Sequence, residues 1–155
     1  MNILDYNAAL RSQFEELLVT YFTVDLNSDI PEDIIRGKLM DLISKQTEDG
    51  VIHVAIATEN DSAIGFSIYQ IDSTHSDWCT RPGWGVIREF YIASASRSKG
   101  FGKALAAYTD AQLKILGSDH LYLTSDDAVQ FWQKCGYSLT DEICSNDLPI
   151  LEKHL

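Results

Sequence analysis

The chain has 155 residues, of which 45% are hydrophobic and 23% charged, so its length suits one domain with a single buried core. Twelve Lys and Arg residues stand against 23 Asp and Glu residues, which gives a formal net charge of −11. This balance argues against general binding to nucleic acids or anionic membranes, because both need an extended basic surface. We predict one domain over residues 1–155 that binds neither nucleic acid nor membrane. The negative charge is compatible with a cationic partner.

The N-terminal residues lack the basic and apolar regions of a signal peptide, and no apolar run approaches the ~18 residues of a membrane span. We therefore expect a soluble, cytoplasmic protein. The cysteines form no close pair and the histidines show no ligand spacing, so we expect reduced thiols and no metal site. These residues are Cys79, Cys135, Cys144, His53, His75, His120 and His154.

The first third of the chain predicts two amphipathic helices followed by a hairpin. Apolar residues recur at helical spacing in two segments, around 10–21 and around 35–43, and Pro31 suits the first turn of the second helix. Two β-rich runs, roughly 51–58 and 63–71, then flank "ENDS", which is a typical turn composition.

The middle of the chain begins with a polar, aromatic segment over 73–85 that contains Pro82 and two glycines, and we expect a loop. Loops of roughly this length without structure of their own are often functional. A strand, "VIREFYI", follows and leads through a glycine-containing loop to a helix from about 101 that ends near Gly117.

The last third predicts a strand, "LYLTS", a short helix that ends at Gly136, and two strands near 137–143 and 150–154. Helices and strands thus mix along the whole chain. The fold class is a mixed α/β domain.

The loop "SRSKGFGKAL", residues 96–105, predicts an anion site. The first amides of a helix lack intrahelical partners and attract phosphate where glycines let a ligand approach closely. No acidic residue lies between Phe90 and Thr109, whereas Arg97, Lys99 and Lys103 contribute +3, leaving −14 for the rest of the chain. Neither a nucleotide P-loop nor a dinucleotide fingerprint fits, because the required Ser or Thr and the third glycine are replaced by Ala104 and Leu105.

The segment "RSKGFG" resembles the Arg/Gln-x-x-Gly-x-Gly/Ala signature of the GCN5-related N-acetyltransferases (GNAT). The strand "REFYI" before it resembles the family's fourth strand, and "AVQFWQKCGYSL" resembles a later helix and the strand after it. The resemblance spans about residues 51–143 and implies a mostly antiparallel sheet with helices on both faces and a central, splayed parallel strand pair.

This resemblance also implies acetyl-CoA as co-substrate, with its diphosphate on the loop and its pantetheine between the strands "VIREFYI" and "LYLTS". The backbone of Tyr91 and Ile92 would meet the pantetheine and the acetyl carbonyl. The diphosphate cradle would comprise Arg97, Lys99, Gly100, Phe101, Gly102 and Lys103.

Acetyl transfer to an amine needs a neutral nitrogen, and a lysine-like amine has a pKa of ~10.4, so a base or a water relay must remove a proton. We predict Glu89 as that base, because several family members carry an acid near this strand position; the alternative is that Glu89 pairs with Arg88 or another cation. Many members place a tyrosine acid where this chain has Trp132, whose indole cannot deliver a proton. We expect a solvent-assisted exit of the thiolate. Tyr137, Tyr91 and Tyr122 are substitute acids only in principle, and the alternative for each is a place in the core.

Substrate choice is expected in the two early helices and in the loop that carries Trp78, Arg81 and Trp84. The acidic composition suggests a small cationic amine as acceptor. The alternatives are a noncatalytic acetyl-CoA-binding regulator on the same fold and, more remotely, a plain interaction domain. Homodimers are common in the family, but the sequence locates no interface.

Overall fold

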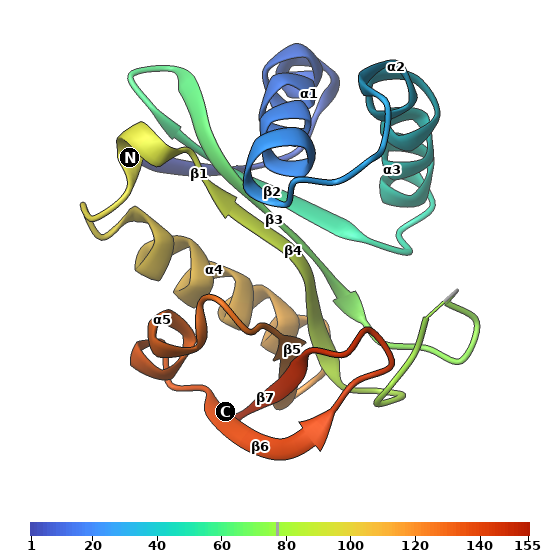
Figure 1. Ribbon diagram of the computed structural model, residues 1–155, viewed down its shortest axis with the longest axis vertical. Helices are drawn as coiled ribbons and strands as arrows, with labels where there is room; N and C mark the ends of the chain where they lie inside the picture. Colours follow the sequence, from blue (N-terminus) through green and yellow to red (C-terminus); the bar gives the residue numbers. More distant parts are fainter. Residues whose placement is uncertain (77) are drawn as a thin grey trace. The chain divides into compact units, whose positions relative to one another are not determined.

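The computed structural model of the chain describes residues 1–76 and 78–155, so Asp77 of the expected 73–85 loop lies outside the described residues. The chain forms two compact units: Met1–Ile68 with Glu89–Leu105, and Tyr69–Arg88 with Ala106–Leu155. Strands β3 (Ser62–Ile71) and β4 (Gly85–Ile92) and helix α4 (Phe101–Ile115) contribute residues to both units (Figure 1). A single domain over the whole chain stays a prediction.

Seven strands form one mixed sheet in the order β1-β2-β3-β4-β5-β7-β6. β4 and β5 pair in parallel through Gly85–Leu121 and Val86–Tyr122, whereas the β1–β2, β5–β7 and β6–β7 pairings are antiparallel. This confirms the predicted mixed α/β fold with a parallel strand pair. The remaining strands are β1 (Asn2–Asp5), β2 (His53–Glu59), β5 (His120–Thr124), β6 (Ser138–Ile143) and β7 (Pro149–His154).

The elements lie close to the predicted segments, with two differences. First, wide π-helical turns at Tyr21–Asp25 and Ile35–Leu39 extend or interrupt the early helices. Second, the sequence does not predict the short strand β1. Within residues 1–76 and 78–155, no helix combines the length and apolar character needed to cross a membrane. The α-helices are α1 (Arg11–Thr20), α2 (Glu32–Ile34), α3 (Met40–Glu48), α4 and α5 (Val129–Lys134), with 3₁₀ turns at Ala8–Leu10 and Ser94–Ser96.

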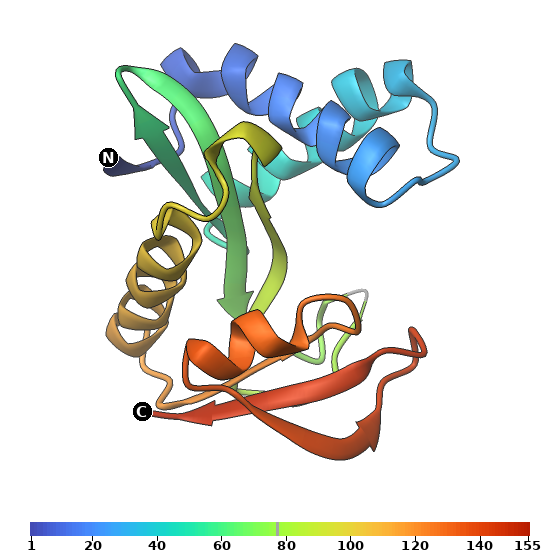
Figure 2. The same ribbon diagram turned by 60° about the vertical axis from the view of Figure 1, so that its left-hand side comes forward.

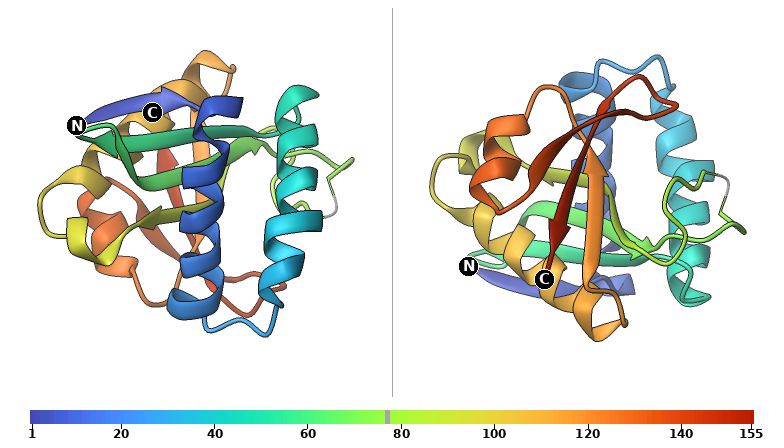
Figure 3. Two further views of the ribbon diagram at one scale, coloured as in Figure 1. Left: turned by 90° about the horizontal axis from the view of Figure 1, so that it is seen from above. Right: turned by 90° about the horizontal axis from the view of Figure 1, so that it is seen from below.

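The core of the first unit forms where α1 and α3 pack on β2 and β3 (Figure 3). Phe14 of α1 is fully buried, and its ring lies 5.2 Å from that of Phe66 of β3. Tyr91 of β4 joins this cluster. Burial of aromatic side chains of this size supplies much of the stabilisation of a small core.

The β2–β3 hairpin turns at Asn60 and Asp61, whose φ angles are +51° and +64° (Figure 2). Two consecutive left-handed residues match the twist of the paired strands, and Asn and Asp tolerate this conformation better than most residues. The "ENDS" turn predicted from the sequence is therefore confirmed.

The core of the second unit contains Val86, Tyr122, Cys144 and Ile150. At the start of β4, a Cβ on Gly85 would lie 2.6 Å from Leu121 and 3.1 Å from Leu113 of α4. Glycine at this position therefore lets the beginning of the strand pack closely against the helix.

In the first unit, Gly65 of β3 allows β4 to approach closely. A Cβ on Gly65 would lie 2.5 Å from the carbonyl oxygen of Tyr91 and 2.6 Å from Cδ1 of Ile92. Since the nearer atom belongs to the backbone, a rotamer change cannot relieve that clash.

We expect Gly65→Ala to lower the free energy of unfolding by about 1 to 3 kcal/mol, the usual cost of overpacking, as measured by urea denaturation. Gly37→Ala is the matched control, because a Cβ there meets nothing within 4 Å. Alanine at this helical position should instead stabilise by about 0.5 to 1 kcal/mol. Equal stabilities of the two variants would contradict the close approach of β3 and β4.

Candidate functional site

The loop between β4 and α4 presents unpaired backbone amides. Ser98 and Gly100 have φ angles of +63° and +85°, and the first helical hydrogen bond runs from Ala104 N to Gly100 O at 3.1 Å. The amides of Phe101, Gly102 and Lys103 therefore precede the helical ladder. Within the described ranges, none of the three donates a hydrogen bond. They form a donor group suited to an anion.

Two lysines flank these amides. Lys99 and Lys103 are exposed, and neither forms an ion pair in the part of the chain that the structure describes. Gly100 has open space around it, since a Cβ there would meet nothing within 4 Å. Amides, free cations and open backbone thus coincide at the start of α4, and the residues present fit a diphosphate.

Arg97 lies differently from the lysines. Its Nε donates to the carbonyl oxygen of Ile92 at 2.8 Å, and its Nη2 contacts Oδ2 of Asp25 at 2.5 Å. The guanidinium carbon also lies 5.6 Å from the ring centre of Tyr91. Arg97 therefore fixes the end of β4, and a contact of Arg97 with diphosphate stays a prediction.

At the end of β4, the N–H and C=O of Ile92 both point to the strand edge that faces away from β3. The carbonyl of Tyr91 faces Gly65, and Ala93 N donates to Ile64 O of the neighbouring strand at 2.7 Å. Because alternate residues of a strand direct their backbone groups to opposite edges, the N–H and C=O of Ile92 point away from β3. The oxygen accepts from Arg97. The N–H lies on the same edge as this contact.

Glu89, the predicted base, accepts a hydrogen bond from the hydroxyl of Tyr21 in the first unit. Arg88, its predicted alternative partner, contributes to the second unit, where Nη2 contacts Asp72 at 3.1 Å. Tyr21 is buried, and its ring lies 5.5 Å from that of Tyr91. The half-buried Glu89 carboxylate therefore accepts a hydrogen bond from a buried tyrosine whose ring is held by aromatic packing.

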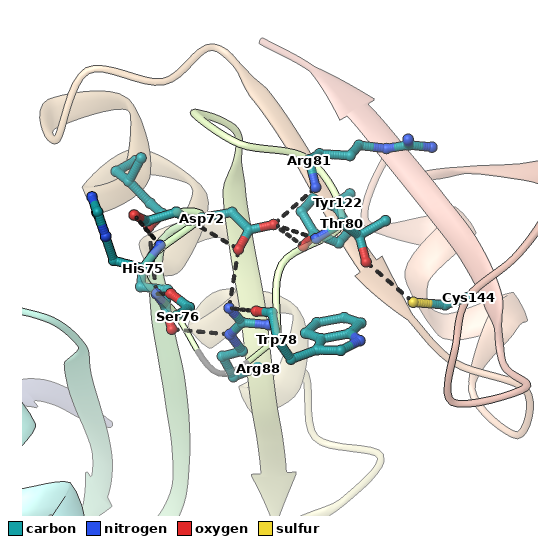
Figure 4. Close-up of polar contacts among 12 residues, drawn as sticks. Asp72, His75, Ser76, Trp78, Thr80, Arg81, Arg88, Tyr122 and Cys144 are labelled. Carbon is teal, nitrogen blue, oxygen red and sulfur yellow. Dashed lines mark hydrogen bonds and ion pairs between the residues drawn. The ribbon is translucent and has the colours of Figure 1, made fainter.

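In the second unit, Asp72 organises the loop that follows β3 (Figure 4). Its fully buried carboxylate accepts from Thr80 N at 3.0 Å, Arg81 N at 2.9 Å and the Tyr122 hydroxyl. Burial alone would raise the pKa of Asp72, but these hydrogen bonds outweigh it and hold the pKa below its usual value. Burial and the bond to Asp72 raise the pKa of Tyr122.

The loop residues expected to determine substrate specificity form side-chain contacts within the second unit. Trp78 Nε1 donates to Ser145 Oγ at 2.8 Å, and the guanidinium of Arg88 lies 4.6 Å from a Trp78 ring centre. Arg81 pairs with Glu142 at 3.1 Å. These contacts give the loop a structural role, and its part in acceptor choice stays a prediction.

Tyr137, the substitute acid, is buried in a polar cluster of the second unit. Its hydroxyl donates to Asp110 Oδ1 at 2.7 Å, and Lys153 Nζ contacts Asp110 Oδ2 at 2.6 Å. Burial and the neighbouring Asp110 carboxylate raise the pKa of Tyr137 well above its usual value. Trp132 packs against Tyr137 with ring centres 5.5 Å apart. The hydroxyl of Tyr137 thus already donates its proton in a hydrogen bond to Asp110, which favours a packing role for Tyr137.

The sequence does not mark two polar residues and one histidine pair of the structure. Tyr21 was read only as an apolar helix position, and Asp25 was not singled out, although both contact predicted site residues. The histidines treated as scattered include His120 and His154, which face each other across β5 and β7 with 2.6 Å between their Nδ1 atoms. No group of three or more potential metal ligands occurs among the described residues.

The sequence profile of the Acetyltransferase (GNAT) family matches residues 11–137, which is most of the chain. This chain belongs to the GNAT family. No curated protein sequence is significantly similar to it.

Solved GNAT structures share the fold of this family member at low sequence identity. A ribosomal-protein-alanine N-acetyltransferase from Brucella melitensis has a TM-score of 0.77 at 13% identity, with 100% of both chains covered. The PaiA N-acetyltransferase from Thermoplasma acidophilum, solved with coenzyme A, has a TM-score of 0.72 at 17% identity, again with 100% of both covered. An aminoglycoside 6′-N-acetyltransferase from Enterococcus faecium has a TM-score of 0.70 at 15% identity, covering 98% of this chain and 94% of that one.

The Tyr137–Asp110 bond predicts a pH-dependent contribution to the stability of this GNAT protein. Tyr137→Phe should lower the free energy of unfolding at pH 7 by about 1.5 to 3 kcal/mol, the range for hydrogen bonds to charged groups. The unfolded chain releases a tyrosine proton near pH ~10, whereas folded Tyr137 keeps it to higher pH, so this stabilisation is lost as the pH rises above that value.

Urea denaturation between pH 7 and pH 11 measures both effects. The variant should lose less stability on alkalinisation than the wild type, although Tyr122 still contributes to the fall. Tyr6→Phe is the control, because the Tyr6 hydroxyl lies 3.3 Å from Ser44 Oγ in the first unit. A Tyr137→Phe protein with the wild-type alkaline slope would show that the bond to Asp110 is unimportant.

Proposed function

We propose that this protein transfers the acetyl group of acetyl-CoA to the primary amine of a small cationic molecule, by direct attack in a ternary complex. The observation that carries the proposal is the N-terminus of α4, where three amides without acceptors among the described residues adjoin the unpaired Lys99 and Lys103. This donor group matches the charge and hydrogen-bonding needs of a diphosphate.

The residues proposed to hold the coenzyme all lie in the first unit. The amides of Phe101, Gly102 and Lys103, with the two lysine side chains, bind the diphosphate. The backbone of Tyr91 and Ile92 lies along the pantetheine. When bound, acetyl-CoA supplies a thioester whose carbonyl carbon the acceptor amine attacks.

The N–H of Ile92 is proposed to donate to the oxygen of that carbonyl. It points to the edge of β4 away from β3, where Arg97 already holds the Ile92 carbonyl. A fixed backbone donor of this kind is worth ~2.7 to 4 kcal/mol when negative charge develops on an oxygen.

Glu89 is proposed to take the proton of the ammonium group, directly or through water. An alkylammonium acceptor with a pKa of ~10.4 is almost fully protonated at pH 7, so proton removal must precede or accompany attack. The half-buried carboxylate is held in place by Tyr21.

Departure of the thiolate is proposed to use solvent. A thiol pKa of ~8.5 makes the thiolate a tolerable leaving group, and indole at Trp132 cannot deliver a proton. The Tyr137 hydroxyl is bonded to Asp110.

The cationic acceptor is supported by the acidic composition of the chain, with 23 acidic residues against 12 basic ones. Charge of this sign attracts cationic molecules over a distance set by ionic strength. The aminoglycosides named for one similar structure are amines of this kind, whereas another is named for the alanine of a ribosomal protein. The fold alone therefore leaves the acceptor open.

A noncatalytic acetyl-CoA sensor is the second candidate, favoured by Trp132 at the position where many family members carry an acidic tyrosine. The two functions differ in one assay, which is release of free coenzyme A in the presence of a broad amine panel. Binding without release for any amine would favour the sensor.

Acetyl-CoA should stabilise the folded protein by about 2.7 kcal/mol at ~100 times its dissociation constant, measured as a thermal shift. Replacing both Lys99 and Lys103 with Ala should weaken binding about tenfold, since each exposed cation contributes up to ~1 kcal/mol, and added salt should reduce the difference. Lys45→Ala is the control, because Lys45 is an exposed lysine of α3 that pairs with Asp49. A protein that ignores coenzyme A altogether would refute the proposed function.

Glu89→Gln should lower kcat by about 10² to 10⁴-fold near neutral pH, the usual contribution of a general base, with little change in acetyl-CoA affinity. The loss should shrink as the pH approaches the pKa of the acceptor amine, because more of the amine is then already neutral. Steady-state kinetics over pH 6–10 test this, and an unchanged pH profile would exclude Glu89 as base. Tyr137→Phe, once shown to be folded, should retain turnover; its loss would make Tyr137 the acid.

A further inference from the structure

The π-helical turn Tyr21–Asp25 contacts two residues of the proposed site. Its first residue, Tyr21, contacts Glu89, and its last, Asp25, contacts Arg97. We infer that Tyr21 is a positioning residue that holds the Glu89 carboxylate ionised and in one orientation, and that the far end of the turn is anchored by Asp25 on Arg97. The effect of Tyr21 on turnover rests on the proposed function, whereas its effect on the charge and orientation of the Glu89 carboxylate does not.

The turn has a defined backbone geometry. Leu26 N donates to Tyr21 O at 2.9 Å, five residues back, and Ser28 N donates to Phe22 O at 2.8 Å. The Thr23 hydroxyl donates to Val19 O at 2.6 Å. Single wide turns of this kind inside helices are rare and occur frequently at functional sites. The spacing between the two ends of the turn is therefore set by hydrogen bonds rather than by chance packing.

At the first end, packing directs the Tyr21 ring. It is 9% exposed, and its centre lies 5.5 Å from the rings of both Phe66 and Tyr91. With the ring fixed, the hydroxyl donates to Glu89 Oε2. A donor aimed at a carboxylate favours the charged form over the protonated form and restricts rotation of the side chain.

At the second end, Asp25 lies against the loop that leads to α4. Its Oδ2 contacts Arg97 Nη2 at 2.5 Å, and Arg97 in turn donates to the carbonyl of Ile92. Burial raises the pKa of Tyr91, and the neighbouring Asp25 carboxylate raises it further, so the three side chains form one electrostatic group. The turn is thus fixed on β4 and its loop at both ends.

The titratable and charged groups near Glu89 are those that can shift the midpoint of its titration. Tyr21 faces the carboxylate from the turn, Tyr91 lies two residues along β4, and the Asp25–Arg97 pair lies beyond Tyr91. Arg88 precedes Glu89 in the strand and contacts Asp72. Of these, only Tyr21 changes in the variant below, so a shift in the Glu89 titration reports the lost hydroxyl.

The deciding experiment is a carboxyl ¹³C NMR titration of glutamate-labelled protein, in which Glu89→Gln assigns the Glu89 signal. Tyr21→Phe should raise the Glu89 titration midpoint by about 1 pH unit, because the ionised form loses its hydrogen bond. Tyr6→Phe, which also removes a hydroxyl from this unit but not from Glu89, should leave the midpoint unchanged. An unchanged or lowered midpoint in Tyr21→Phe would overturn the inference, whether or not the protein proves to be an enzyme.

Kinetics then test the link to turnover. Tyr21→Phe should lower kcat about tenfold at pH 7 and move the acid limb of the pH–rate profile to higher pH, with the KM for acetyl-CoA unchanged. In a Glu89→Gln background the same change should have no further effect, which is the signature of coupled residues. Additive losses, or a raised KM with an unmoved acid limb, would assign Tyr21 to packing alone. A wild-type protein that acetylates no amine would refute the proposed function and leave the titration result standing.

Discussion

The close approach of Gly65 to β4 is the constraint on which the proposed site depends. Gly65 leaves room for the Tyr91 carbonyl, which faces β3, and the alternation of backbone groups along the strand leaves those of Ile92 on the opposite edge. The same strand presents Glu89 to the hydroxyl of Tyr21. A backbone donor and a carboxylate are therefore placed by one strand, and the loop that follows it leads directly to the free amides of α4.

Much of the fold and the donor group at the start of α4 could be predicted from the sequence, because the relevant signals are local. Helical and strand periodicity located most elements, and the Asn60–Asp61 turn follows from residues that tolerate left-handed backbone. The donor group at the start of α4 needs only two glycines and two lysines, all within residues 99–103. Such features depend on a few neighbouring residues, and the chain has little freedom to place them elsewhere.

The remaining features depend on contacts between distant parts of the chain. Tyr21 and Glu89 are 68 positions apart and Asp25 and Arg97 are 72 apart, so no short pattern marks either pair. The bond between the Tyr137 hydroxyl and Asp110 likewise joins residues 27 positions apart. β1 escaped prediction because four residues are too few to show alternation, and its identity as a strand comes from pairing with β2.

The wide turn after α1 also limits how the length of this segment can change. A π-helical turn differs from an α-helix by one additional residue, so deleting one position from 22 to 24 would restore a regular helix. The extra residue is accommodated within the turn itself, so the chain after a single deletion would keep nearly its present direction. A second deletion would shorten a regular helix, in which each residue turns the chain by about 100°, and the carboxylate now on Arg97 would swing to another side of the helix while Tyr21 stayed in place. This segment should therefore tolerate the loss of one residue better than the loss of two.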